Sequence, residues 1–128
     1  MVSKALVSQI DLLSSLGSLV QARFPKGSAP DSRDYLPTLL GKDLKGRNYV
    51  IGQSNTHVLS VLTAQYRYIE PSNGPKMIQW GPKIETGNLP FPQLYDMTVS
   101  PFEFKNVADE HPDEVSRMQL ILKEERNR

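Results

Sequence analysis

The stretch His57-Val-Leu-Ser-Val-Leu-Thr-Ala-Gln-Tyr-Arg-Tyr-Ile69 decides the fold expected for this chain. It is rich in β-branched and aromatic residues, which favour extended backbone. One face carries Val58, Leu62, Ala64, Tyr66 and Tyr68, and the opposite face carries Thr63, Gln65 and Arg67. Because side chains alternate between the two faces of a strand, the pattern predicts a strand over residues 57–69 with one polar face.

Three further segments extend this strand into a sheet. The turn sequence Asn73-Gly74 supplies positive φ angles at little cost, so we expect a long central hairpin whose return strand covers residues 77–80. Residues 48–53 are interpreted as a short strand that ends at Gly52. Residues 94–104 alternate again and predict a further strand, which Pro101 bends or ends.

The first 24 residues allow two interpretations. Apolar residues such as Leu6, Ile10 and Leu13 could mark one face of a helix, but they also fit two strands of period two. Serines and Gly17 in the middle of the segment are poor helix residues and good turn residues. We therefore favour an N-terminal hairpin, and we expect residues 25–46 to form loops around at most one short strand or turn.

The last part of the chain changes to helical spacing. Pro112 suits the first turn of a helix, and acidic residues precede a stripe that includes Val115, Met118 and Leu122. One helix against a mainly antiparallel sheet predicts an α+β fold. With 128 residues, we expect one domain over residues 1–128.

Composition and spacing favour a protein without catalytic or metal chemistry. The chain has no cysteine, and its two histidines, His57 and His111, lie at the expected edges of elements without the spacing of metal ligands. There is no serine elbow and no glycine-rich phosphate loop. The first residues lack the features of a signal peptide, and no apolar run is long enough to span a membrane. We therefore expect no enzyme, cofactor, metal or membrane partner.

The net charge of the chain is +1, but the charges are distributed unevenly along it. Residues 1–95 carry ten basic and six acidic side chains, a net charge of +4, whereas residues 96–128 carry five basic and eight acidic ones, a net charge of −3. Such a division is a weak indication of a polyanionic partner on the basic side.

The polar face of the central hairpin has the donors and acceptors that contact RNA. Arg and Lys contact phosphates, while Gln, Thr and Asn suit base edges and 2′-hydroxyls. The candidate RNA-binding residues are Thr63, Gln65, Arg67, Asn73, Lys76 and Gln79, with Asp96 and Thr98 on the adjoining strand. The alternative is that any half-exposed antiparallel sheet has one polar face.

The order of elements resembles the coat proteins of single-stranded RNA bacteriophages (levivirus type). The resemblance rests on the alternating strand from Leu94 to Ser100, the acidic helix start at residues 109–115, and the Thr63-x-Gln65-x-Arg67 strand followed by Asn73. It implies a structural capsid protein of a virion, which forms a homodimer, assembles into an icosahedral shell and binds genomic RNA on its inner face. It implies no small-molecule substrate.

The resemblance also implies which residues meet in the dimer. They are Tyr95, Met97, Val115, Met118 and Leu122. Pairing of two open sheet edges would enlarge a small core. Two rival interpretations are a monomeric nucleic-acid-binding barrel of the OB type and a non-catalytic adaptor subunit of a cytoplasmic complex.

Overall fold

The structure is a computed structural model that describes residues 3–81, 83–100, 102 and 105–128. The chain divides into two compact units, residues 1–50 and residues 51–128, and each is described by itself. Within the described residues, no helix is both long and apolar enough to cross a membrane.

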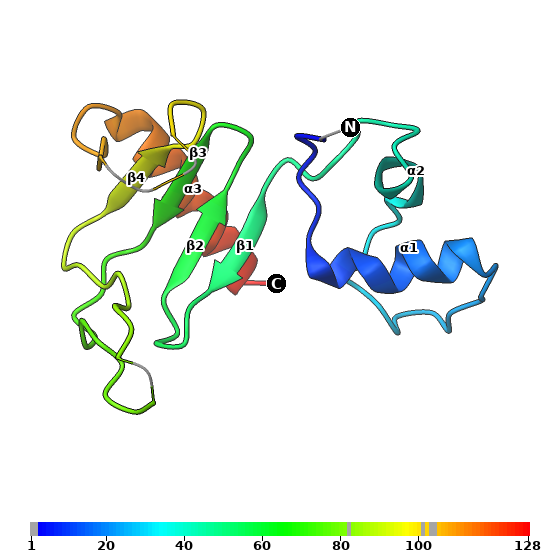
Figure 1. Cartoon of the computed structure of the whole chain (residues 1–128), viewed down its shortest axis with the longest axis horizontal. Helices are drawn as coiled ribbons and strands as arrows, with labels where there is room; N and C mark the ends of the chain where they lie inside the picture. The colour runs from blue at the N-terminus through cyan, green and yellow to red at the C-terminus, as the bar shows by residue number, and fades with distance from the viewer. Residues whose placement is uncertain (1–2, 82, 101, 103–104) are drawn as a thin grey trace. The chain divides into compact units, whose positions relative to one another are not determined.

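The strands of the second unit form one sheet of simple order (Figure 1). They are β1 (Val50–Gln53), β2 (Leu59–Leu62), β3 (Tyr66–Ile69) and β4 (Gln93–Asp96), hydrogen-bonded in that order. The pairs β2–β3 and β3–β4 are antiparallel. With the C-terminal helix α3 (Pro112–Arg126), the unit confirms the expected α+β fold of an antiparallel sheet and one helix.

The single long strand expected over residues 57–69 is wrong, because the chain turns back in its middle. Thr63 accepts hydrogen bonds from the backbone N–H of Tyr66 at 3.0 Å through its hydroxyl oxygen, and its own N–H donates to the Tyr66 carbonyl at 2.9 Å. Ala64 and Gln65 therefore form the loop of a tight β2–β3 hairpin. A threonine hydroxyl that bonds nearby backbone stabilises such a turn without an Asn-Gly sequence.

The strands expected on either side of this hairpin are also shorter than predicted. The return strand over residues 77–80 is wrong: in the part of this segment that the structure describes, pairing is limited to one bridge between Met77 and Glu85. Strand β4 ends at Asp96, whose carboxylate accepts from the N–H of Thr98 at 2.8 Å and so turns the chain. The expected effect of Pro101 and the end of the predicted strand at Phe104 lie outside the described residues.

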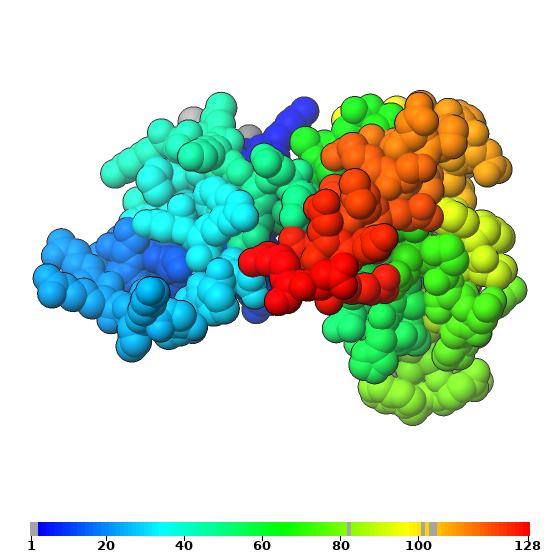
Figure 2. All heavy atoms as spheres, turned by 180° about the vertical axis from the view of Figure 1, so that it is seen from behind, coloured from blue at the N-terminus to red at the C-terminus, as the bar shows by residue number. Residues whose placement is uncertain are grey.

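Helix α3 packs on one face of the sheet and forms the core with it. It lies behind the strands in Figure 1 and in front of them in Figure 2. Met118 and Leu122 of α3 are buried, as are Val61, Tyr68 and Leu94 of the strands. Burial raises the pKa of Tyr68, whose hydroxyl is hydrogen-bonded with Gln119 of α3. Tyr68 therefore faces the helix.

The first unit is helical at its start, so the expected N-terminal hairpin is wrong. A single 3₁₀ turn, η1 (Gln9–Asp11), leads into α1 (Leu12–Leu19), and α2 (Leu36–Leu39) follows in a loop-rich segment. Asp11 accepts from the N–H of Ser8 at 2.9 Å and so caps the start. Ser15 is a poor helix residue by propensity, but its hydroxyl accepts a hydrogen bond from the N–H of Tyr35, which offsets part of that cost.

The interior of the first unit is polar. Asp11 is completely buried and accepts two hydrogen bonds from Arg47, from Nε at 2.7 Å and from Nη2 at 2.5 Å. Its Oδ1 also accepts from the N–H of Arg33 at 3.0 Å. Ser15 is buried too, and its hydroxyl accepts from the N–H of Tyr35 at 2.9 Å. These bonds fasten residues 33–35 and 47 to the start of the helix.

Candidate functional site

A pocket lies on the face of the sheet that α3 leaves open. Because Tyr68 faces α3, its neighbours Arg67 and Ile69 project to the other side of β3. Ser60, which pairs with Ile69 across β2 and β3, shares that side. These residues form the floor of a pocket of about 400 Å³ within the second unit. Its volume lies in the usual range for small-ligand sites.

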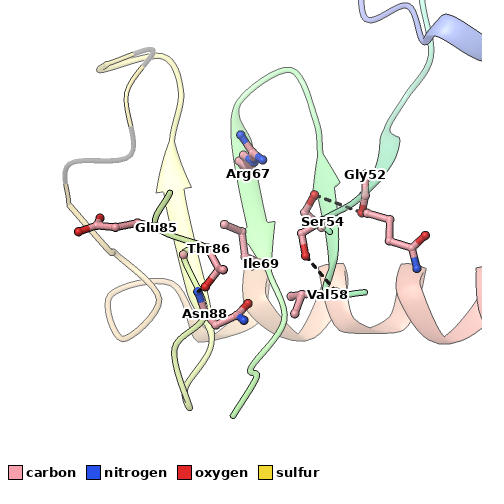
Figure 3. A pocket seen from close by; sticks show the side chains of 11 residues that line it. Gly52, Ser54, Val58, Arg67, Ile69, Glu85, Thr86 and Asn88 are labelled. Carbon is pink, nitrogen blue, oxygen red and sulfur yellow. Dashed lines mark hydrogen bonds between the residues drawn. The ribbon is translucent and has the colours of Figure 1, made fainter. Parts of the chain in front are cut away.

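Two loops form the walls of this pocket (Figure 3). The figure shows Ser54 and Gly52 on one side of β3 and Thr86 and Asn88 on the other. The complete lining consists of Gly52, Gln53, Ser54, Val58, Ser60, Arg67, Ile69, Glu85, Thr86, Gly87 and Asn88. The lining is therefore mostly polar, with two aliphatic side chains.

Hydrogen bonds hold the wall formed by residues 86–88. Asn88 is buried, and its Nδ2 donates to the carbonyl of Pro75 at 3.0 Å while its Oδ1 accepts from the Thr56 hydroxyl at 3.2 Å. The Thr86 hydroxyl donates to the same Pro75 carbonyl at 2.5 Å. A β-carbon on Gly74 would come within 2.7 Å of Asn88 Nδ2, so glycine is needed for this close approach. The wall is thus positioned by side chains and is not a loose loop.

The opposite wall is held at the start of the sheet. The Ser54 hydroxyl accepts from the N–H of Val58 at 3.2 Å, and the Ser60 hydroxyl donates to the carbonyl of Gly52 at 3.4 Å. A β-carbon on Gly52 would lie 2.8 Å from the Ser60 hydroxyl oxygen. A side chain at position 52 would therefore require the Ser60 hydroxyl to move.

Two side chains in the lining carry charge, Arg67 and Glu85. Arg67 lies on the floor and opposite Tyr95 of β4. Tyr95 is buried, and its hydroxyl donates to Gln93 Oε1 at 2.7 Å. A guanidinium can donate parallel hydrogen bonds to the oxygens of a carboxylate, phosphate or sulfate, whereas serine, threonine and asparagine suit hydroxyl groups. The lining therefore fits a polar ligand that carries an anionic group.

The structure gathers only part of the set of residues expected to bind RNA. Of that set, Arg67 lines the pocket. Gln65, Asp96 and Thr98 meet at the other end of β3, where Asp96 accepts from Gln65 Nε2 at 3.4 Å and from the Thr98 hydroxyl at 2.6 Å. The hydrogen bonds from Thr98 and Gln65 lower the pKa of Asp96. Thr63 is buried in the turn between β2 and β3.

The remaining predicted residues lie in loops or in the core. Asn73, Lys76 and Gln79 are exposed in the segment between β3 and β4. Of the residues expected in a dimer interface, Tyr95, Val115, Met118 and Leu122 are buried within this chain's own core, and Met97 is half-buried. In the described residues, no group of three His, Cys, Asp or Glu side chains could hold a metal ion.

Most of the pocket was missed by sequence reasoning. Period two along the expected strand places Ser60 on the face opposite Arg67, and it is the β2–β3 hairpin that brings both residues to the open face. Residues 85–88 carry no pattern that marks them as pocket residues. Their place beside β3 depends on long-range bonds such as the one between Asn88 and Thr56, for which local sequence carries no signal.

Comparison with known proteins identifies sulfatases as relatives of this chain. It is 42% identical over 125 residues to an N-acetylgalactosamine-6-O-sulfatase of Bacteroides thetaiotaomicron, a match that covers 98% of the chain and 24% of the relative. It is 29% identical to an ulvan-active sulfatase of Formosa agariphila, over 95% of the chain and 28% of that relative. The chain thus spans about a quarter of the curated relatives that it matches. No known family model matches it.

Solved structures agree with these relatives. A structure described under the metabolism of multiple glycosaminoglycans by Bacteroides thetaiotaomicron superposes with a TM-score of 0.89 at 40% identity, over 98% of this chain and 26% of that one. A putative sulfatase of the same organism superposes with a TM-score of 0.61 over 89% of this chain and 23% of that one. At 23% identity, the second likeness concerns the fold alone.

These relatives overturn the interpretation as a bacteriophage coat protein. A match over nearly the whole chain to sulfatases contradicts a capsid subunit, a virion location, and partnership with RNA and a capsid homodimer. It leaves the rival barrel and adaptor interpretations without support. The expectation of a protein unrelated to catalysis or to small substrates is also wrong, because the relatives are named as enzymes. Topology misled the prediction, since a sheet of antiparallel strands with a following helix is shared by unrelated proteins.

Proposed function

We propose that this chain acts as part of a sulfatase and that its pocket contacts the sulfated sugar. The observation that carries the proposal is the 42% identity over 98% of the chain to a sulfatase named for N-acetylgalactosamine. Since the chain spans about a quarter of that relative, it supplies one part of such a protein. The substrate class that follows is a sulfated glycan.

The chemistry of the pocket supports this assignment. The Arg67 guanidinium suits the oxygens of a sulfate group, to which it can donate two hydrogen bonds. Ser54, Ser60 and Thr86 offer hydroxyl groups, and the Glu85 carboxylate can accept from sugar hydroxyls. Val58 and Ile69 offer apolar surface for the faces of a sugar ring.

Titration of the full chain with sugars tests the role of the pocket. We expect 6-O-sulfated N-acetylgalactosamine to shift the amide NMR signals of Gly52, Ser60 and Gly87, and unsulfated N-acetylgalactosamine to do so much less. Replacing Arg67 by glutamine should weaken binding by about tenfold or more, as expected when a hydrogen bond to a charged group is lost. Arg23→Gln, an exposed arginine outside the lining, serves as the matched control and should bind as the native chain does. Equal responses to the two sugars would contradict the proposal.

A chimeric protein, called the joined protein below, tests the activity itself. In this protein the chain replaces the matching residues of the Bacteroides thetaiotaomicron sulfatase, and release of sulfate from the 6-O-sulfated sugar is measured. We expect release to persist, and Arg67→Gln to raise KM more than it lowers kcat, because the side chain binds the substrate and does not break the ester. A folded joined protein without sulfate release would overturn the assignment.

A further inference from the structure

Helix α1 has buried small and polar residues and exposed apolar ones, the reverse of an ordinary amphipathic helix. Its buried residues include Ser15 and Gly17, and the preceding residue, Asp11, is buried as well. Its apolar residues lie outside. We call the exposed set the leucine face: Leu12, Leu13, Leu16, Leu19 and Val20, which are between 40% and 72% exposed. A helix of a globular protein normally directs such a stripe inward.

Helical geometry makes these residues one continuous surface. Leu16, Leu19 and Val20 follow Leu12 by four, seven and eight positions, the spacing of a single helix face, and Leu13 lies beside them. Contiguous exposed apolar patches of this kind mark places where another protein surface binds. The leucine face is therefore a candidate interaction surface.

Hydrogen bonds prevent the helix from rotating to bury its leucines. The N–H of Ser14 donates to the Ser32 hydroxyl at 3.0 Å, and the Ser15 hydroxyl accepts from the N–H of Tyr35 at 2.9 Å. Asp11 accepts from Arg33 and Arg47 on the same side. Rotation would leave these buried polar groups without partners, at a cost of roughly 1–3 kcal/mol for each. The orientation of the leucine face is thus built into the unit.

We infer that the leucine face docks on the larger part of a sulfatase, an inference that rests on the function proposed above. The solved sulfatase that superposes with a TM-score of 0.89 contains this fold within a chain about four times as long. The match includes nearly all of this chain, so the segment of α1 belongs to the shared fold. The occupant is accordingly an apolar surface of the remaining three quarters of such a protein, whether on the same polypeptide or on another.

The test compares the same substitutions in two settings. Leu13→Lys with Leu16→Lys is introduced into the full chain alone and into the joined protein described above, and the melting temperature is measured in each. In the chain alone both side chains are half exposed, so we expect little change. In the joined protein we expect a fall of roughly 5 °C or more, because two lysines must then be buried. Leu120→Lys, 55% exposed on α3, is the matched control and should leave both melting temperatures unchanged.

Each other result would overturn the docking. An equal fall in both settings means that this chain or a second copy of it covers the leucine face, and size-exclusion chromatography separates these two cases. No fall in either setting means that the surface stays open to solvent. A joined protein that does not fold with native leucines also counts against docking. The sugar titration of the chain alone remains an independent measure of the proposed function.

Discussion

Asp11 and Arg47 form an ion pair of 2.5 Å in which the aspartate side chain is completely buried and the arginine is 13% exposed. Arg47 Nη2 also donates to the carbonyl of Asp31 at 2.5 Å, so one guanidinium joins three segments of the first unit. The N–H of Arg47 donates to the carbonyl of Leu6 at 2.7 Å, and Gly46 permits this approach because a β-carbon there would lie 2.6 Å from the Leu6 carbonyl oxygen. The ion pair therefore lies at the centre of the hydrogen bonds that hold this unit together.

Replacing Asp11 by asparagine should destabilise the first unit by about 3 kcal/mol, because it leaves a nearly buried guanidinium without its counter-charge. Hydrogen exchange of the amides of Ser8 and Arg33, which donate to Asp11, measures the effect directly. Asp43→Asn is the matched control, since that exposed carboxylate accepts only from neighbouring backbone in the bonds described. Unchanged exchange in Asp11→Asn would show that the ion pair contributes little.

Acid should destabilise the first unit through the same residue. Burial tends to raise the pKa of Asp11, but hydrogen bonds from Arg47, Ser8 and Arg33 and the charge of Arg47 outweigh burial and lower the pKa below its ordinary value of 3.8. The unfolded state then takes up the proton first as pH falls. The stabilisation is complete above the ordinary value and is lost as pH falls through the folded-state pKa. Thermal unfolding followed over this pH range should show the loss in the native chain and a flatter profile in Asp11→Asn.

Glu70 should contribute more to the stability of the second unit than Arg126, the arginine that it binds. Its Oε1 accepts from the N–H of Leu59 at 2.8 Å at the start of β2, and its Oε2 binds Arg126 Nη2 of α3 at 2.6 Å. Glu70→Ala removes both contacts and should cost about 1–2 kcal/mol. Arg126 is 54% exposed, so Arg126→Ala should cost less than about 1 kcal/mol. Urea unfolding followed by far-ultraviolet circular dichroism compares the two, and equal losses would contradict the role of the Leu59 contact.

Local signals in the sequence predicted the C-terminal helix well. Pro112 occupies the first turn, Asp113 and Glu114 follow it, and Lys123 and Arg126 lie in the last turn, each favourable for the helix dipole. The buried stripe of Val115, Met118 and Leu122 was visible as helical spacing. Here intrinsic preference and tertiary packing agree, which is why the prediction succeeded.

The β2–β3 hairpin and α1 could not be predicted in the same way. The hairpin turns at Ala64 and Gln65, neither of which is a turn residue, because Thr63 supplies the stabilising hydrogen bonds. In α1 Ser15 is buried and Leu16 is exposed, the reverse of the pattern on which such predictions depend. The pocket was found only at Arg67, since its walls come from segments that long-range contacts bring together.

The polar interior of the first unit has a calorimetric consequence. Among its described residues, Tyr35 is the only apolar side chain that is buried. The heat capacity increase on unfolding arises mainly from newly exposed apolar surface, whereas exposure of polar surface reduces it. Melting of this unit should therefore produce a small heat capacity step, and its stability should vary with temperature along a flatter curve than that of the sheet and α3. Hydrophobic attraction weakens on cooling, so this unit should also be the less sensitive of the two to cold.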